Sequence, residues 1–227
     1  MKHMMTNLGE RVARAHDQAL LAAAGQPASK PDTPDAAADA EAQLNYWVAT
    51  NHHFNSSLWA EEDLALRTQV SDSEIAKNKR AIDKFNQARN DATERVDEVL
   101  LTALGLVDAQ SARSDSPVSQ VPAGARLNSE TAGSIIDRMS IMALKIYAMR
   151  KQTERQDVDE THRAESRVKL ARLEQQRADL GACLDALIAD CQAGRAYFKV
   201  YRQFKMYNDP RFNPVLVAEQ AARGSGS

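Results

Sequence analysis

The sequence is poor in cysteine and in aromatic residues, and it has neither a long apolar run nor a large excess of one charge. Without roughly 20 consecutive apolar residues it offers no candidate membrane span, and residues 1–20 lack the compact apolar segment of a secretory signal. The 29 Lys and Arg against 31 Asp and Glu give a net charge of −2, which provides no electrostatic footprint for nucleic acid or an anionic membrane. We therefore expect a cytoplasmic protein that binds no nucleic acid.

The two cysteines, Cys183 and Cys191, are eight residues apart within a predicted helix. At a rise of about 1.5 Å per residue their Cα atoms would stand roughly 12 Å apart, beyond the approximately 7 Å that a disulfide spans. We expect no bridge between them, and we expect both to pack as small side chains facing the core.

Several well-known functional motifs are absent. The glycine-rich motifs of P-loop and Rossmann proteins, the H-E-x-x-H motif and Cys/His zinc spacings do not occur, which excludes those classes. No serine-nucleophile motif is present either. His52 and His53 are adjacent, so on a helix they point about 100° apart and cannot chelate one ion together. We expect ordinary packing or exposure for both.

Helical periodicity fills most of the sequence, whereas the strict alternation of a strand is almost absent. We predict an all-α fold, a helical bundle of about five main helices with a long loop at 105–127 between the third and the fourth. The predicted helices span 5–24, 36–67, 73–104 (after a cap at Ser71 or Asp72), 129–152 and 157–192. We divide the chain into an N-terminal helix (1–24) set apart by a linker (25–38), a bundle domain (39–208) and a tail (209–227) ending in an expression linker.

Residues 195–208 interleave aromatic with basic side chains, among them Tyr197, Phe198, Lys199 and Arg202. This pattern is typical of RNA-binding or phosphate-binding surfaces. We favour a different interpretation, an amphipathic closing helix whose aromatic side chains pack on the bundle and whose basic side chains face solvent.

Charged residues interrupt a helix that is otherwise apolar nearly all round. Residues 134–149 include Asp137, Arg138 and Lys145. An apolar helix is expected to be buried, and a buried charge is costly unless it is paired or hydrogen-bonded. We therefore expect a polar site inside the core. Arg138 should be buried, paired with carboxylates, and more important for stability than a surface arginine such as Arg163.

A second polar stripe runs along the predicted helix 73–104. Its members project within roughly 80° of one another, and their Asn and Thr residues suggest hydrogen bonds between helices. They are Lys79, Asp83, Asn86, Asn90, Thr93 and Asp97, with Arg89 nearby on the apolar face. Because the two stripes can satisfy one another, we expect Lys79, Asn86, Arg89 or Asn90 to lie within about 10 Å of Asp137, Arg138 or Lys145.

Three blocks of sequence carry a resemblance to a known family. They are Asn55, Leu58–Trp59, Glu62–Asp63 and Arg67; then KRAIDKFNQARND at 79–91; then LNSETAGSIIDRMSIMALKIYAM at 127–149. Together they resemble a bacterial domain of unknown function, number four-two-five-four, closely over about residues 44–149 and loosely in the downstream helix. The resemblance implies an all-helical cytoplasmic protein, often encoded near glycosyltransferase and other cell-envelope polysaccharide genes. It supplies no catalytic residues.

Our first hypothesis is an accessory protein of cell-envelope glycan assembly whose internal polar site binds an anionic small molecule, a sugar phosphate or a nucleotide sugar. Cations would contact the anion, asparagines would bind hydroxyl groups, and carboxylates would orient the cations. The candidate ligand-binding residues are Lys79, Asn86, Arg89, Asn90, Asn128, Arg138 and Lys145. The supporting carboxylates are Glu62, Asp63, Asp83, Glu130 and Asp137.

Two further hypotheses stay open. All-α nucleoside triphosphate pyrophosphatases hold Mg²⁺ with an E-E-x-x-E block and a later E-x-x-D; Glu61–Glu62 and Glu94-x-x-Asp97 are similar, but Ala65 replaces the third Glu. For such metal-assisted phosphoanhydride hydrolysis the candidate ligands are Glu62, Asp63, Glu94, Asp97 and Asp137. Helical chorismate mutases, which line a pocket with Arg and Lys, are similar in charge type.

The third hypothesis is a structural homo-oligomer whose buried charges set helix register. The sequence assigns no cofactor with certainty. Mg²⁺ is the possible one, and only the hydrolase hypothesis requires it.

Overall fold

The computed structural model describes residues 3–27, 29–35, 37–203 and 209–224, and in these ranges the chain is mostly helical, as predicted. The elements are the 3₁₀ turn η1 His3–Met5, α1 Leu8–Ala22, α2 Ala40–Ala65, α3 Asp72–Ala103, α4 Ala109–Ala112, β1 Arg126–Leu127, α5 Ala132–Glu154, α6 Glu160–Gln192, β2 Ala196–Tyr197 and α7 Pro214–Gly224. No helix in the described ranges has both the length and the apolar character needed to cross a bilayer.

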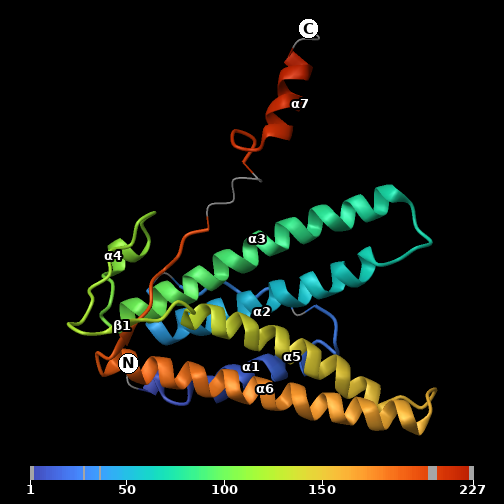
Figure 1. Cartoon of the computed structure of the whole chain (residues 1–227), viewed down its shortest axis with the longest axis horizontal. Coiled ribbons are helices and arrows are strands. Elements are labelled where there is room, and N and C mark those ends of the chain that lie inside the picture. The colour runs from blue at the N-terminus through green and yellow to red at the C-terminus, as the bar shows by residue number, and fades with distance from the viewer. Residues whose placement is uncertain (1–2, 28, 36, 204–208, 225–227) are drawn as a thin grey trace.

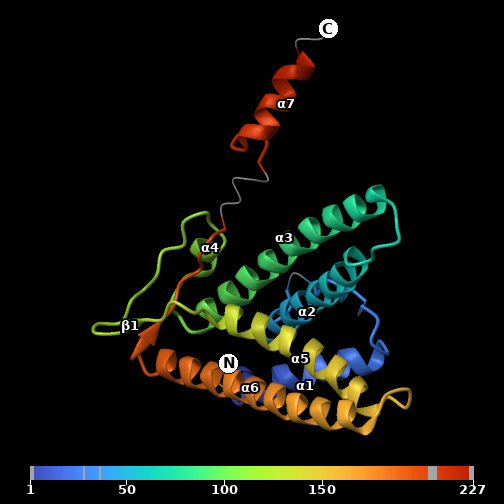
Figure 2. The same ribbon diagram turned by 45° about the vertical axis from the view of Figure 1, so that its right-hand side comes forward.

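Two long helical hairpins form the body of the molecule (Figures 1 and 2). One consists of α2 and α3, the other of α5 and α6, and α1 lies against α5 and α6. The hairpins meet at the end that carries β1 and diverge from there, so the loop end of the α2–α3 hairpin projects from the bundle. The apolar core lies where the hairpins meet, and it includes Leu44, Val48, Val96, Leu100, Ile136, Met139, Leu184 and Ile188.

The start of α3 follows directly from its sequence. The Ser71 side chain accepts a hydrogen bond from the backbone N–H of Glu74, and the Glu74 side chain accepts one from the backbone N–H of Ser71. This reciprocal capping satisfies two donors that a helix start otherwise leaves open. The predicted cap is confirmed at Ser71.

The first helix, which the sequence suggested might stand apart, packs into the bundle. Leu8 and Val12 of α1, with Met4 and Met5 before it, are buried in the same core as the hairpins. At the crossing of α1 and α6, Gly9 and Gly181 bring the two backbones together, and the Gly9 N–H donates to Asp185 of α6 at 3.0 Å. The linker therefore does not separate α1 from the core.

The segment after α6 corrects the predicted closing helix. Residues 195–203 contain no helix, and β2 pairs in parallel with β1. Ala196, Phe198 and Val200 are buried, while the side chains between them are less covered. This alternation is the two-residue period of a strand, which the interleaved aromatic and basic residues concealed. Residues 204–208 of the predicted helix lie outside the described residues.

Two smaller expectations also change. Cys191 is buried as expected, but Cys183 is exposed, because it lies on the outer side of α6. The predicted tail contains α7, which Figure 1 shows standing away from the bundle.

The Gly9–Gly181 crossing gives the first prediction. A methyl group at Gly9 would stand 2.5 Å from the backbone oxygen of Gly181, whereas one at Gly181 would meet nothing closer than 3.6 Å. We expect Gly9→Ala to lower the free energy of unfolding by about 2 kcal/mol or more through overpacking. Gly181→Ala should stay within about 1 kcal/mol of wild type, because alanine is the better helix former. Urea denaturation measures both; equal losses would contradict the close crossing.

Candidate functional site

A largely buried polar network joins α2, α3 and α5 around the carboxylate of Asp137. Asn51 and Asn55 of α2 donate their side-chain amides to Asp137 Oδ1 at 2.8 and 2.9 Å. The Asn51 amide also donates to Thr93 Oγ1 of α3 at 3.1 Å, and the Asn55 amide to Ser140 Oγ of α5 at 3.1 Å. Three helices are thereby connected through one carboxylate.

Helical spacing explains why these residues meet. Asn51 and Asn55 are four residues apart on α2, Arg89 and Thr93 four apart on α3, and Asp137 and Ser140 three apart on α5. Residues at these separations lie on one helix face. Each of the three helices therefore places its polar residues on the side that faces the Asp137 carboxylate.

Arg89 is the cation that faces Asp137. Its Nη1 lies 3.8 Å from Asp137 Oδ2, and its Nη2 donates to Asn90 Oδ1 at 3.0 Å. Arg89 Nε is buried and has no hydrogen-bond partner. The side chains are 24% (Arg89) and 16% (Asp137) exposed, so the network reaches the surface at this point. The expected approach of the two polar stripes is confirmed by this pair.

A histidine pair extends the network toward α1. His52 Nδ1 lies 2.8 Å from Ser140 Oγ, and the His52 ring stacks on that of His16 with centroids 4.5 Å apart. Burial lowers the pKa of His52 to about 4, although Asp17 acts in the opposite direction. Burial, helped by His52 and Arg177, also holds the pKa of His16 well below its usual value. Both rings are therefore neutral near pH 7.

Sequence reasoning missed what α2 and α1 contribute. Asn55 stood in the family blocks, but Asn51, His52, Ser140 and His16 were not site candidates. The available signal was the polar run T-N-H-H-F-N-S-S at 50–57 in the middle of a long helix, where an exposed face would ordinarily carry charged residues. Six of its eight members are buried: Thr50, Asn51, His52, Asn55, Ser56 and Ser57.

The expected burial of Arg138 is wrong. Its side chain is 55% exposed and pairs with Glu130, which is 39% exposed. Arg163 is the more covered residue at 24%. Lys145 is exposed as well. Both cations lie on the outer side of α5, because only the opposite side of this helix faces α2 and α3, which provide the contacts of Asp137.

The other predicted ligand-binding residues are scattered. Lys79 and Asp83 are exposed and pair with each other, Glu62 and Asp63 are exposed near the end of α2, and Asn86 is half-buried. Along α3, Lys79 stands roughly 15 Å from Arg89. Asn128 donates its side-chain amide to the Glu130 carbonyl, next to β1. Of the predicted set, the structure brings Arg89, Asn90 and Asp137 together.

The predicted metal ligands do not converge. Glu94 pairs with Arg202 at 2.9 Å. Asp97 Oδ1 accepts from the backbone N–H of Gly133 at 2.6 Å, so it caps the start of α5; burial, partly offset by bonds from Thr131 and Gly133, raises its pKa to about 7. Within the described ranges, no three His, Cys, Asp or Glu side chains gather as a metal site requires. This placement does not support the hydrolase hypothesis.

Removing the central carboxylate should test the network. Asp137→Ala would leave the amides of Asn51 and Asn55 without this acceptor and the Arg89 guanidinium without its countercharge, so we expect the free energy of unfolding to fall by about 3 kcal/mol. The matched change Glu130→Ala, in the exposed pair with Arg138, should cost less than about 1 kcal/mol. Urea denaturation compares them, and equal losses would show that Asp137 does not hold the helices together.

The buried histidines predict acid sensitivity. The folded-state pKa of His52 is about 4 against 6.5 for an ordinary histidine, so the unfolded state binds the proton first as pH falls. This stabilisation is complete above pH 6.5 and is lost as pH falls toward 4, and about 2 kcal/mol of it has been lost at pH 5. Asp97, with its raised pKa, acts in the opposite direction over part of this range. We therefore compare wild type with His52→Asn at pH 7.5 and pH 5.

His52→Asn should lose about 2 kcal/mol less between these pH values than wild type does, in urea unfolding. Parallel losses in the two proteins would mean that His52 ionises as readily in the folded state as in the unfolded state.

Comparison with known proteins gives one finding. A family model described as a protein of unknown function (DUF4254) matches residues 45–200. The match covers more than half of the chain and includes Asn51, Asn55, Arg89, Asp137 and Ser140. No curated protein and no solved structure matches the chain.

Proposed function

The chain belongs to the DUF4254 family of proteins of unknown function, as its three sequence blocks indicated, and on that premise we propose that the polar network between α2, α3 and α5 binds a sugar phosphate or nucleotide sugar. One observation carries the proposal. Arg89 stands at the accessible edge of the network with a buried Nε that has no partner.

Arg89 has donor capacity that the protein does not use. Of its five N–H donors, one bonds to Asn90, while the contact with Asp137 at 3.8 Å is too long for a hydrogen bond. A guanidinium in this state is suited to a phosphate group, which accepts two parallel hydrogen bonds from it.

The same edge offers groups for sugar hydroxyls. Both amide hydrogen bonds to Asp137 end on Oδ1, so Oδ2 can accept from a hydroxyl. Asn90 and the half-buried Asn86 lie four residues apart on α3, beside Arg89.

The proposed setting is the bacterial cytoplasm, where the protein would be an accessory of cell-envelope glycan assembly. This setting rests on the gene neighbourhood that the family resemblance implies. Sugar phosphates and nucleotide sugars are the activated precursors of such glycans, and they combine the phosphate and hydroxyl groups that the network is suited to bind.

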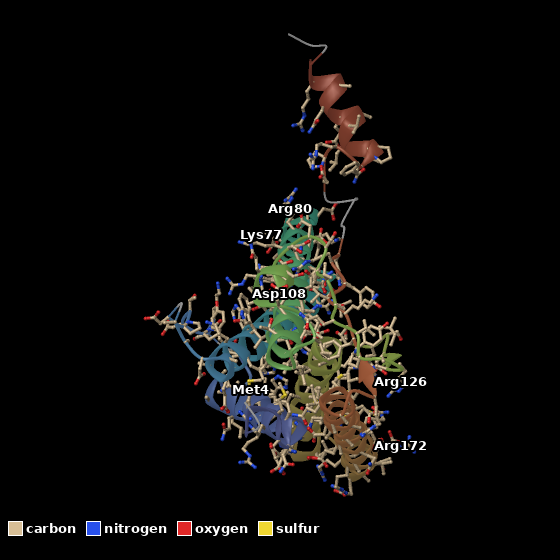
Figure 3. The ribbon with its side chains drawn as sticks, turned by 90° about the vertical axis from the view of Figure 1, so that its left-hand side faces the viewer. Met4, Lys77, Arg80, Asp108, Arg126 and Arg172 are labelled. Carbon is tan, nitrogen blue, oxygen red and sulfur yellow. The ribbon has the colours of Figure 1, made fainter. Side chains whose placement is uncertain are left out.

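Titration calorimetry with UDP-glucose, glucose 1-phosphate and glucose tests the proposal. We expect the two phosphorylated probes to bind and free glucose to bind at least tenfold more weakly, because a charge-assisted hydrogen bond contributes about 1.5–3 kcal/mol. Arg89→Gln should weaken the phosphorylated probes by about 10- to 100-fold. Arg80→Gln is the matched control, since Arg80 is exposed at the projecting end of α3 (Figure 3).

Equal effects of Arg89→Gln and Arg80→Gln would assign binding to general surface charge and overturn the proposal. Failure of both phosphorylated probes to bind wild type, or to raise its thermal unfolding midpoint, would favour the structural hypothesis, in which the network only sets helix register.

A further inference from the structure

A cavity of about 350 Å³ lies between α1 and α2, outside the phosphate-binding edge. Ser29 and Pro31 of the segment between the two helices also line it. Its walls are largely aliphatic, and are formed by Leu8, Val12, Ala15, Ala19, Leu44, Val48 and Ala49. A cavity of this size lies in the range that holds a small organic molecule.

Two buried rings, His16 and His52, also line the cavity, and they supply unsatisfied polar atoms. Each residue is 1% exposed, and three of their four ring nitrogens have no hydrogen-bond partner: both nitrogens of His16, and Nε2 of His52. Buried polar atoms are rarely left unpaired, since each costs about 1–3 kcal/mol. Both residues line the cavity, and a small shift of the rings would let an occupant provide the partners.

The hydrogen-bond pattern defines what the occupant must offer. Ser140 Oγ accepts from Asn55, so its own proton can go to His52 Nδ1. The proton of the neutral His52 ring is then on Nε2, which becomes a donor without an acceptor. Neutral His16 presents one donor and one acceptor. The pair therefore needs a group that both accepts and donates a hydrogen bond.

We propose that this cavity is a second binding site, which takes an uncharged, mainly apolar molecule and holds its single hydroxyl group between His16 and His52. The hydroxyl accepts from His52 Nε2 and donates to His16, while the aliphatic walls enclose the rest of the molecule. This site is independent of Arg89 and of the phosphate-binding proposal.

Other occupants fit less well. Water finds polar partners on one part of the lining, at Gln18, Ser29 and Asn45, but the aliphatic part offers none of the two to four polar partners that each water needs. A transition metal would find two histidines, and the described residues place no third His, Cys, Asp or Glu beside them. Of the arginines at the rim, Arg14 pairs with Glu10 and Arg11 with Glu41, so an anion would have to displace these carboxylates.

The matched probes p-cresol and toluene differ only in the hydroxyl group. By calorimetry at pH 7 we expect p-cresol to bind wild type about tenfold more tightly than toluene, which is the effect of one buried hydrogen bond. His16→Phe keeps the ring stack but removes both nitrogens, so the preference for p-cresol should fall below about threefold while toluene still binds. His53→Phe, at a residue that does not line the cavity, should keep the preference, and so should Arg89→Gln.

Histidine ¹⁵N NMR spectra of the wild-type protein test the same proposal without requiring that any variant folds. We expect p-cresol, but not toluene, to shift the Nε2 resonance of His52 and a ring resonance of His16. The proposal is overturned if neither probe binds, if both bind equally with unchanged histidine spectra, or if Zn²⁺ alone shifts these resonances and excludes p-cresol.

Discussion

The carboxylate of Asp137 is the group on which the arrangement of the three central helices depends. It is largely buried, so it needs donors and a countercharge: Asn51 and Asn55, on two successive turns of α2, donate their amides, and Arg89 of α3 places its guanidinium 3.8 Å away. This requirement explains why α2 carries amides and hydroxyls on a face where a bundle helix ordinarily carries leucine. The polar network fixes the rotation of α2 about its axis, because turning it by one residue would remove both amides from Asp137.

The helices α5 and α1 begin in the same manner, each at a close contact with a neighbouring helix. Asp97 of α3 accepts from the N–H of Gly133 at the start of α5, and Asp185 of α6 accepts from that of Gly9 at the start of α1. In each case a neighbouring helix supplies the acceptor that the first turn lacks. Glycine is needed because a side chain would collide with the neighbouring backbone, at Thr93 or Gly181. Asp97, a metal candidate by its sequence spacing, is therefore a helix cap.

The sequence was sufficient to predict the helical fold, a cap at Ser71 or Asp72, and the approach of the polar stripes that contain Arg89 and Asp137, because each rests on local periodicity or on the need to pair a buried charge. It was insufficient for Arg138 and Lys145, since an apolar helix does not show which of its sides faces the core. The contribution of Asn51, His52 and His16 depends on how α1 and α2 cross α5, which no local pattern encodes. Phe198 packs in the core as predicted, but its segment was wrongly predicted to be a helix, because a strand of two residues leaves little periodic signal.

The divergence of the two hairpins has a consequence for local stability. Beyond Arg89 the projecting end of α2 and α3 has mostly exposed side chains, so it can open without disturbing the core. Backbone amides near residues 61–77 should exchange with solvent through such local opening, whereas those around Asp137 exchange only when the whole bundle unfolds. Arg89 lies at the boundary between these two parts of the molecule. Its side chain therefore stands between a hairpin end that can open locally and the Asp137 network, which stays folded until the whole bundle unfolds.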